Sequence, residues 1–287
     1  MEEKANRISG KMAVKGDKME IKDYDTYISG MRKTYYDKCW WINHIPDNIK
    51  YIIDFGCADA GIFEFIDSMY PGRFIYIGVE ENEEMLKIAK EKYGGNERVC
   101  LCKSLNEVRG TFPPYDAILL LNSVLHEILT YKTYVEYMNF LFEVRKLAPA
   151  FIAIRDMNNL DPKPVADIRS KIHNNDRFKE HLLYSGFGEY DINLYIEFLL
   201  KYFYDKNWDR EVRETYLWKL DFYFERFLCE YMRIFDNVAG QFIIYHGCYS
   251  VEYEEDFSIK YLRDKWEKDF GVKIDIPTHK KMLFKRN

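Results

Sequence analysis

The chain has 287 residues, of which 47% are hydrophobic and 17% aromatic, so it is long enough to form one large domain with a substantial core. Its formal net charge of −5 argues against a general electrostatic attraction to nucleic acid or to an anionic membrane, although a local basic face is compatible with that total. The longest apolar stretches, at residues 117–124 and 195–200, are too short to span a bilayer, and the first residues lack the apolar core of a signal peptide. We therefore expect a cytoplasmic protein without a membrane partner.

From residue 24 onward the chain alternates between helical and β-rich patterns. The first 22 residues have the composition of a mobile tail, and residues 24–45 then predict one helix that Pro46 ends. Asn82 is the predicted N-cap of a later helix. Strands are expected at residues 51–55, 74–79, 98–102, 115–121 and 151–154, with helices at 62–69, 82–92 and 130–146. This alternation predicts a doubly wound, mostly parallel α/β sheet with a ligand crevice at the carboxyl ends of its strands.

The alternation stops after residue 157. Residues 158–236 have long helical patterns rich in Tyr and Phe, which predicts a helical insertion. Two further strands, at 241–250 and 277–285, flank a helix at 256–270 and bring the sheet to seven strands. The expected organisation is therefore a tail at 1–22, a core at 23–157, a lid insertion at 158–236 and a segment at 237–287 that completes the core.

Six cysteines are scattered along the chain without a paired CxxC pattern. This spacing indicates neither a secreted disulfide framework nor a structural zinc site. We expect free thiols at Cys39, Cys57, Cys100, Cys102, Cys229 and Cys248.

The most informative motif is IIDFGCADAG at residues 52–61, where a buried strand ends in an acid and a small-residue turn. Small residues let the backbone approach a ligand closely, and the following helix presents free N–H groups. The next strand ends at Glu80, where a carboxylate can accept hydrogen bonds from both hydroxyls of a ribose. The two features together favour a nucleoside ligand.

This pattern resembles the class I S-adenosylmethionine (SAM)-dependent methyltransferases, whose first motif is an apolar strand, an acid and a GxGxG-like turn. Ala58 replaces the middle glycine, a change that family tolerates. The resemblance implies that SAM is the cofactor and that the turn cradles its methionine end. The implied cofactor-binding residues are Asp54, Gly56, Cys57, Ala58, Gly61, Glu80 and Glu81, with Ser104 and Leu105 flanking the adenine, and Asn122 and Ser123 after the fourth strand. More weakly, residues 27–41 resemble a segment that some of these enzymes fold over the cofactor.

Two other nucleotide-binding classes fit the motif less well. A dinucleotide dehydrogenase usually needs the fuller GxGxxG turn for a pyrophosphate, and DFGCADAG does not supply it. The DFG triplet lacks the catalytic loop and lysine strand of a kinase.

Candidates for the transfer step follow the fourth and fifth strands. A general base is needed only when the acceptor must lose a proton. His126 could act as that base with Glu127 orienting it, or it could be a helix-start histidine bonded to the backbone. Arg155 and Asp156 could bind the acceptor, or could form an ordinary ion pair.

Several specialised chemistries are not expected. No DPPY- or NPPY-like tetrapeptide and no Pro-Cys nucleophile follows the fourth strand, which argues against amino methylation of a flipped base and against pyrimidine carbon methylation. His126, Glu127 and the distant His173 lack a two-histidine helix spacing, so we predict no metal.

The insertion is the expected lid over the acceptor. Its aromatic side chains could stack a planar substrate or could form the insertion's own core. They are Tyr195, Phe198, Tyr202, Phe203, Trp208, Tyr216, Trp218, Phe222 and Tyr223. Arg210, Arg213 and Lys219 could meet phosphate, but acidic residues alternate with them as on a solvated helix face.

The sequence thus leads to two hypotheses. The first is a methyltransferase acting on an oxygen or nitrogen of a small molecule or a nucleic acid, with the oligomeric state open. The alternative is a methyltransferase-like subunit that holds the cofactor or a partner without turnover. The intact pair of Asp54 and Glu80 favours cofactor binding.

Overall fold

The computed structural model describes the sheet, the helices around it and part of the expected insertion. The described residues are 24–125, 128, 132–157, 162–176, 178–179, 182, 188–204, 248–271, 273 and 276–287. The predicted tail at 1–22 lies outside them.

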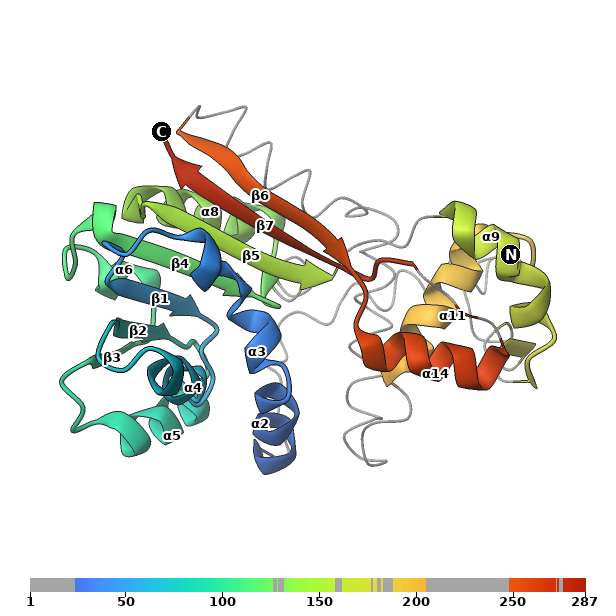
Figure 1. The fold of residues 1–287 in the computed structure, drawn as a ribbon, viewed down its shortest axis with the longest axis horizontal. Coiled ribbons are helices and arrows are strands. Elements are labelled where there is room, and N and C mark those ends of the chain that lie inside the picture. The colour runs from blue at the N-terminus through green and yellow to red at the C-terminus, as the bar shows by residue number, and fades with distance from the viewer. Residues whose placement is uncertain are drawn as a thin grey trace.

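A seven-stranded sheet runs through the molecule in the order β3-β2-β1-β4-β5-β7-β6 (Figure 1). Neighbours from β3 to β5 are parallel, whereas β7 runs antiparallel to both β5 and β6. The strands are β1 (Tyr51–Phe55), β2 (Ile75–Val79), β3 (Val99–Cys102), β4 (Ala117–Asn122), β5 (Phe151–Met157), β6 (Tyr249–Phe257) and β7 (His279–Arg286). The predicted mostly parallel, seven-stranded α/β sheet is confirmed.

Two of the helices between the first five strands begin at a residue whose side chain caps them. Asn82, the predicted N-cap, accepts hydrogen bonds from the backbone N–H groups of Glu84 and Met85. Thr133 forms a capping box with Glu136. Such caps satisfy N–H groups that have no partner within the helix. The helices are α4 (Ile62–Met69), α5 (Glu83–Tyr93), α6 (Leu105–Val108) and α8 (Tyr134–Leu147), with a 3₁₀ helix η2 (Pro114–Asp116).

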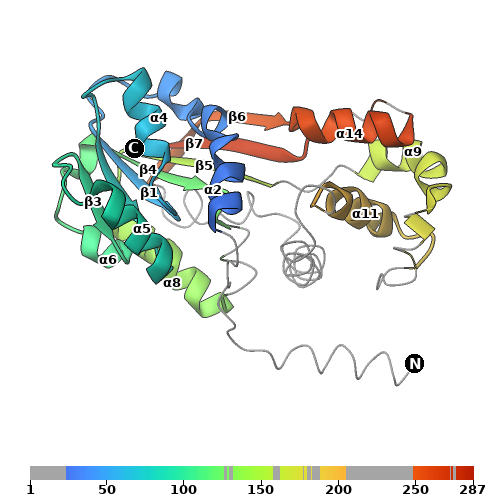
Figure 2. The same ribbon diagram turned by 90° about the horizontal axis from the view of Figure 1, so that it is seen from below.

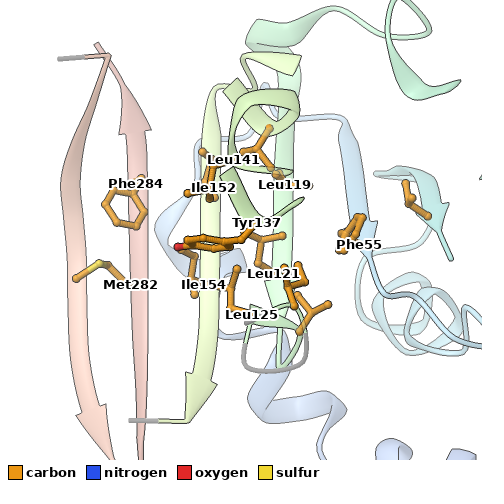
Figure 3. Close-up of a cluster of buried hydrophobic side chains, with 14 of the residues drawn as sticks. Phe55, Leu119, Leu121, Leu125, Tyr137, Leu141, Ile152, Ile154, Met282 and Phe284 are labelled. Carbon is orange, nitrogen blue, oxygen red and sulfur yellow. The ribbon is translucent and has the colours of Figure 1, made fainter. Parts of the chain in front are cut away.

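Two apolar layers cover the two faces of the sheet. One contains Ile53 and Leu119, packed with Leu141 of α8 (Figure 3). The other contains Ile52 and Ile118 together with residues of α4, α5 and the N-terminal helices. Successive strand residues point to opposite faces, so a strand covered on both sides is apolar throughout.

The strand order reverses at β1, which lies between β2 and β4. At such a reversal the connections after the two central strands leave toward opposite faces and open a crevice at the carboxyl ends. The loops after β1 and β4 therefore lie next to each other at the carboxyl edge of the sheet, where ligands bind in folds of this kind.

The prediction of one helix at residues 24–45 is wrong, because this segment folds as three short helices. The Thr34 hydroxyl donates a hydrogen bond to the Met31 carbonyl oxygen at 2.7 Å, and such bonds compete with helical pairing. The consecutive residues 40–42 are all buried, which one face of an α-helix cannot achieve. The three are α2 (Tyr24–Arg32), α3 (Tyr35–Lys38) and the 3₁₀ helix η1 (Trp40–His44).

The sixth strand lies later in the chain than predicted. β6 extends to Phe257, and α14 (Lys260–Phe270) follows it, while residues 241–247 lie outside the described residues. Glu254 and Glu255 form ion pairs with Lys280 and Lys281 of β7, with N–O distances of 2.6 and 3.3 Å. Cross-strand pairs of opposite charge stabilise a sheet, so this charged segment forms an edge strand without an apolar pattern.

Two helices of the expected insertion, α9 (Pro162–His173) and α11 (Ile192–Tyr204), lie with α14 beyond the carboxyl end of β5 (Figures 1 and 2). The boundaries proposed for the insertion, 158–236, stay a prediction, as does its role as a lid. No helix among the described residues is long and apolar enough to cross a bilayer.

The Asn82 cap gives a direct test of how α5 begins. Asn82→Ala removes the acceptor for two N–H groups, so we expect the free energy of unfolding to fall by about 1 kcal/mol in urea titrations. Ser104 stands at the N-cap of α6 without a capping hydrogen bond, so Ser104→Ala is the matched control and should cost less than about 0.5 kcal/mol. Equal losses would contradict the capping role.

Candidate functional site

The loop after β1 is built from left-handed backbone. Gly56, Ala58 and Ala60 have φ values of +75°, +49° and +55°. Left-handed geometry costs a residue with a side chain roughly 1–2 kcal/mol, and such strain persists where the surroundings enforce it, often at functional sites. A Cβ at residue 56 would lie 3.2 Å from Val124 Cγ2, so Gly56 also lets this loop approach the loop after β4.

Small residues also bring the N-terminal helices against this loop. A Cβ at residue 61 would lie 2.5 Å from the Tyr35 hydroxyl of α3, so Gly61 lets this side chain approach the loop closely. The buried Asp59 carboxylate accepts a hydrogen bond from Gly61 N–H at 3.0 Å and forms ion pairs with Lys92 and Arg32 at 3.5 and 3.6 Å. These contacts hold α2, α3 and α5 around the loop.

Glu80 connects the carboxyl ends of β1 and β2. One of its carboxylate oxygens accepts a hydrogen bond from Ala58 N–H and the other from Asn82 N–H, both at 2.8 Å. The two backbone donors, one on each oxygen, therefore orient the Glu80 carboxylate at the carboxyl ends of these strands. A carboxylate is the kind of acceptor that a ribose diol requires.

Asp54 lies deeper than Glu80. Its carboxylate is buried and accepts a hydrogen bond from the Tyr76 hydroxyl at 2.5 Å. Burial raises the pKa of Asp54 to about 6, against the opposing effects of the Tyr76 hydrogen bond and of Lys38. Asp54 therefore connects β1 and β2 through its bond to Tyr76.

Asn122 ends β4 with an amide group that has no hydrogen-bond partner among the described residues. It is 8% exposed, and neither its amide oxygen nor its amide nitrogen makes a hydrogen bond. A buried unsatisfied polar group costs about 1–3 kcal/mol, so each one in a native structure calls for an explanation. The next residue, Ser123, is left-handed with φ of +58°.

The strand register puts these groups on one face. Asp54 pairs with Leu120 on β4, and Asn122 pairs with Arg155 on β5. Residues two apart on a strand share a face. Asp54, Asn122 and Arg155 therefore share the face that α3 covers.

Arg155 and Asp156, as neighbours on β5, point to opposite faces and take different partners. Arg155 donates from Nε to Asp37 on α3 at 2.6 Å and from Nη1 to the Ser123 hydroxyl at 2.9 Å. The Asp156 carboxylate accepts from Leu125 N–H at 2.9 Å. The alternative reading of an Arg155–Asp156 pair is replaced by an ion pair between Arg155 and Asp37.

A second buried cation joins Arg155. Lys281 Nζ lies 3.0 Å from Asp37 and 3.3 Å from Glu255. The Phe257 ring lies 4.2 Å from Lys281 Nζ and 5.4 Å from Arg155 Cζ, within the range of cation–π contacts. Asp37 thus neutralises two cations at the end of β5 and β7.

Sequence reasoning missed Asp37, Lys281 and Glu255. Lys281 lies opposite Arg155 because β7 runs antiparallel, which brings its first residues to the carboxyl edge of the parallel strands. Asp37 reaches both cations from α3, and Glu255 reaches Lys281 from β6. The alternating charges of β6 opposite the lysines of β7 are the one local signal that could have indicated this cluster.

The other predicted site residues lie in different surroundings. Glu81 is exposed and forms an ion pair with Lys132 at 2.9 Å. Leu105 is 5% exposed and its side chain belongs to the core, so only its backbone can face a ligand, whereas Ser104 is half-buried. Burial raises the pKa of Cys57, which keeps its thiol protonated. His126 and Glu127 lie outside the described residues.

In the insertion, the structure favours a packing role for two of the aromatic candidates. Tyr195 stacks on Phe178 with ring centroids 4.7 Å apart, and Phe198 meets Phe178 edge-on at 5.2 Å. Both candidates are buried. The Tyr202 and Phe203 side chains, and Trp208, Arg210, Arg213, Tyr216, Trp218, Lys219, Phe222 and Tyr223, lie outside what the structure describes.

Within the described ranges, no three His, Cys, Asp or Glu side chains are arranged to hold a metal ion. A hollow lined by Lys92 and residues 95–98 lies before the amino end of β3, at the edge of the sheet away from the loops described above.

A search of solved structures finds methyltransferases of low sequence identity and low TM-score. No protein-family model and no curated protein matches the chain. A SAM dependent methyltransferase from Aquifex aeolicus is 18% identical with a TM-score of 0.38, over 50% of this chain and 76% of that one. The methyltransferase domain of bacterial-CtHen1-C is 14% identical with a TM-score of 0.43, over 89% of this chain and 97% of that one. The plantazolicin methyltransferase BpumL in complex with SAH is 13% identical with a TM-score of 0.45, over 92% of this chain and 85% of that one.

The strand order and the antiparallel β7 define the chain's fold as a doubly wound, mostly parallel α/β sheet. Five parallel strands carry the loops of the candidate site, and an antiparallel pair of strands completes the sheet.

Removing Asp37 should test the charge cluster. Asp37→Ala leaves Arg155 and Lys281 close together without their shared carboxylate, and we expect a loss of about 3 kcal/mol in unfolding free energy. This value is the lower end of the range for buried pairs, because the Asp37 side chain is 32% exposed. The control is Asp176→Ala, whose surface pair with Lys179 should contribute less than about 1 kcal/mol. A loss no larger than the control's would refute the anchoring role.

The raised pKa of Asp54 predicts a pH dependence of stability. An aspartate in the unfolded chain titrates near 3.9, so between that pH and about 6 the folded state binds more protons than the unfolded state. Stability therefore falls as pH rises through this window. Asp54→Asn cannot ionise, so its stability relative to wild type should increase between pH 4.5 and 7.5 in urea titrations.

The control for this pH effect is Asp67→Asn. Hydrogen bonds from Arg98 lower the pKa of Asp67 to about 2, so both its folded and unfolded titrations are nearly complete by pH 4.5. The stability of the Asp67→Asn variant relative to wild type should therefore stay constant between pH 4.5 and 7.5. A constant difference for Asp54→Asn as well would contradict the raised pKa.

Proposed function

We propose that this protein is a SAM-dependent methyltransferase that modifies an oxygen or nitrogen of a small-molecule or nucleic-acid acceptor. The observation that carries the proposal is the buried amide of Asn122 at the end of β4, which has no hydrogen-bond partner among the described residues. A ligand with both donors and acceptors would satisfy that amide.

The residues present fit a nucleoside with an amino-acid tail. The turn from Gly56 to Ala58 would hold the methionine end, since its left-handed backbone brings main-chain groups close to a ligand. The oriented Glu80 carboxylate would accept the two ribose hydroxyls. Ser104 and the backbone of Leu105 would flank the adenine, and Asn122 and Ser123 would close the site from β4.

The same features fit a dinucleotide less well. A pyrophosphate needs several N–H groups from a GxGxxG turn and the following helix. Here Asp59 lies in that turn and already accepts the Gly61 N–H. The Gly61 N–H is therefore already bonded and cannot donate to a pyrophosphate, whereas SAM carries no phosphate.

Bound SAM supplies an electrophilic methyl group on a sulfonium, so the protein's task is to position the acceptor and to exclude water. Asn122 and Ser123 are proposed to fix the reacting end. Arg155 holds Ser123 and is itself held by Asp37, so we assign it a positioning role. His126, oriented by Glu127, is the proposed base where the acceptor must lose a proton.

Glu80 offers the sharpest test of cofactor binding. Glu80→Ala removes charge-assisted hydrogen bonds worth about 1.5–3 kcal/mol each. We therefore expect the SAM affinity measured by calorimetry to fall by roughly 10- to 150-fold for each bond that is lost. Glu84→Ala, an exposed acid in the first turn of α5, is the matched control and should bind as wild type. Thermal unfolding of each variant would show that the fold is kept. If wild type, Glu80→Ala and Glu84→Ala bind SAM with equal affinity, Glu80 is not part of the cofactor site.

Cofactor binding alone does not separate an enzyme from a non-catalytic subunit. Incubation with methyl-labelled SAM and pools of RNA, DNA and small molecules should give labelled product that depends on Glu80. Tight SAM binding without transfer to any pool would favour the alternative of a binding subunit.

A further inference from the structure

A pair of cysteines lies outside the candidate site on the edge strand β3 (Figure 1). Cys100 and Cys102 are two residues apart, so they share one face of the strand. Their Sγ atoms are 3.8 Å apart. Cys102 is 7% exposed and packs in the core, whereas Cys100 is exposed to solvent. The pair is therefore a dithiol with one sulfur accessible from outside.

The strand geometry does not favour a disulfide. Alternate residues of a strand have Cα atoms about 6.6 Å apart, near the upper limit for disulfides, whose usual distance is about 5.5–6 Å. The two sulfurs would also have to approach to about 2.05 Å. The rigid pairing of β3 with β2 opposes that movement.

The spacing matches a pair of ligands on one soft metal ion. Two thiolates at tetrahedral positions, each about 2.3 Å from zinc, have sulfur atoms about 3.8 Å apart. We propose that Cys100 and Cys102 form a bidentate site for one soft divalent ion of the zinc or cadmium class. Binding replaces two S–H bonds with two metal–sulfur bonds and releases two protons.

The protein supplies two ligands to this ion. Among the residues that the structure describes, no third His, Cys, Asp or Glu completes a set. The Glu107 carboxylate, which influences Cys102 electrostatically, accepts hydrogen bonds from Lys103 N–H and from the Ser104 hydroxyl. The remaining coordination positions would be taken by water, which makes the ion exchangeable and favours thiophilic ions over hard ones.

The dithiol lies beside the proposed cofactor site without being part of it. The Cys102 carbonyl accepts a hydrogen bond from Glu80 N–H at 3.1 Å. The chain then continues directly to Ser104 and Leu105. The metal proposal does not depend on the methyltransferase proposal, because its ligands and its test do not involve SAM.

Cadmium titration of the reduced, full-length protein would test the proposal. Formation of cadmium–thiolate bonds gives an ultraviolet charge-transfer absorption, which should saturate at one ion per chain. Because the second thiolate binds intramolecularly, Cys100→Ser should weaken cadmium binding by roughly 10²–10⁴-fold. Cys100 is exposed, so this variant should keep the wild-type thermal unfolding temperature.

Cys248→Ser is the matched control, since Cys248 is a half-buried cysteine before β6, at the other end of the sheet. It should bind cadmium as wild type does, and excess Mg²⁺ should not displace the ion. Unchanged cadmium affinity in a folded Cys100→Ser variant would overturn the proposal. An equal loss in Cys248→Ser, or displacement by Mg²⁺, would overturn it too.

Discussion

One carboxylate, that of Asp37, neutralises two cations buried at the end of β5 and β7, and the candidate site is organised around this interaction. Two like charges this close are tolerated away from water only when an anion lies between them. Because Asp37 belongs to α3, the same contact fixes the N-terminal helices on the sheet. Tyr35 of α3 then meets Gly61, and Arg155 is left free to hold the Ser123 hydroxyl.

Around this anchor the protein tolerates several locally unfavourable features. Ala58, Ala60 and Ser123 adopt left-handed backbone, and Asn122 buries an amide without a partner in the described part of the chain. Each of these lowers the stability of the folded chain by about 1–3 kcal/mol. Their concentration at the carboxyl ends of β1 and β4, at the reversal of strand order, is what a preorganised ligand site requires. Elsewhere in the two described core layers, the strands follow ordinary apolar patterns.

Chemical differences between neighbouring acids also arise from position rather than residue type. Asp54 is buried beneath the loop, and its pKa is raised to about 6. Glu80 is half-buried and oriented by two backbone N–H groups. Asp59 is buried but lies between two cations. The three carboxylates thus differ in environment: Asp54 is buried against Tyr76, Glu80 is oriented by backbone donors, and Asp59 ties two helices to the loop.

The sequence by itself determined the parallel core, the cap at Asn82 and the small-residue turn before Glu80, because these depend on residues close together in the chain. Tertiary structure decided the rest. The N-terminal segment breaks at Thr34, where a hydroxyl competes for a backbone carbonyl, and the charged β6 is a strand only because the lysines of β7 lie opposite it. The cluster of Asp37, Arg155 and Lys281 joins residues more than a hundred positions apart. A local sequence pattern cannot predict this contact, because the contact forms only when the antiparallel β7 returns to the edge where the parallel strands end.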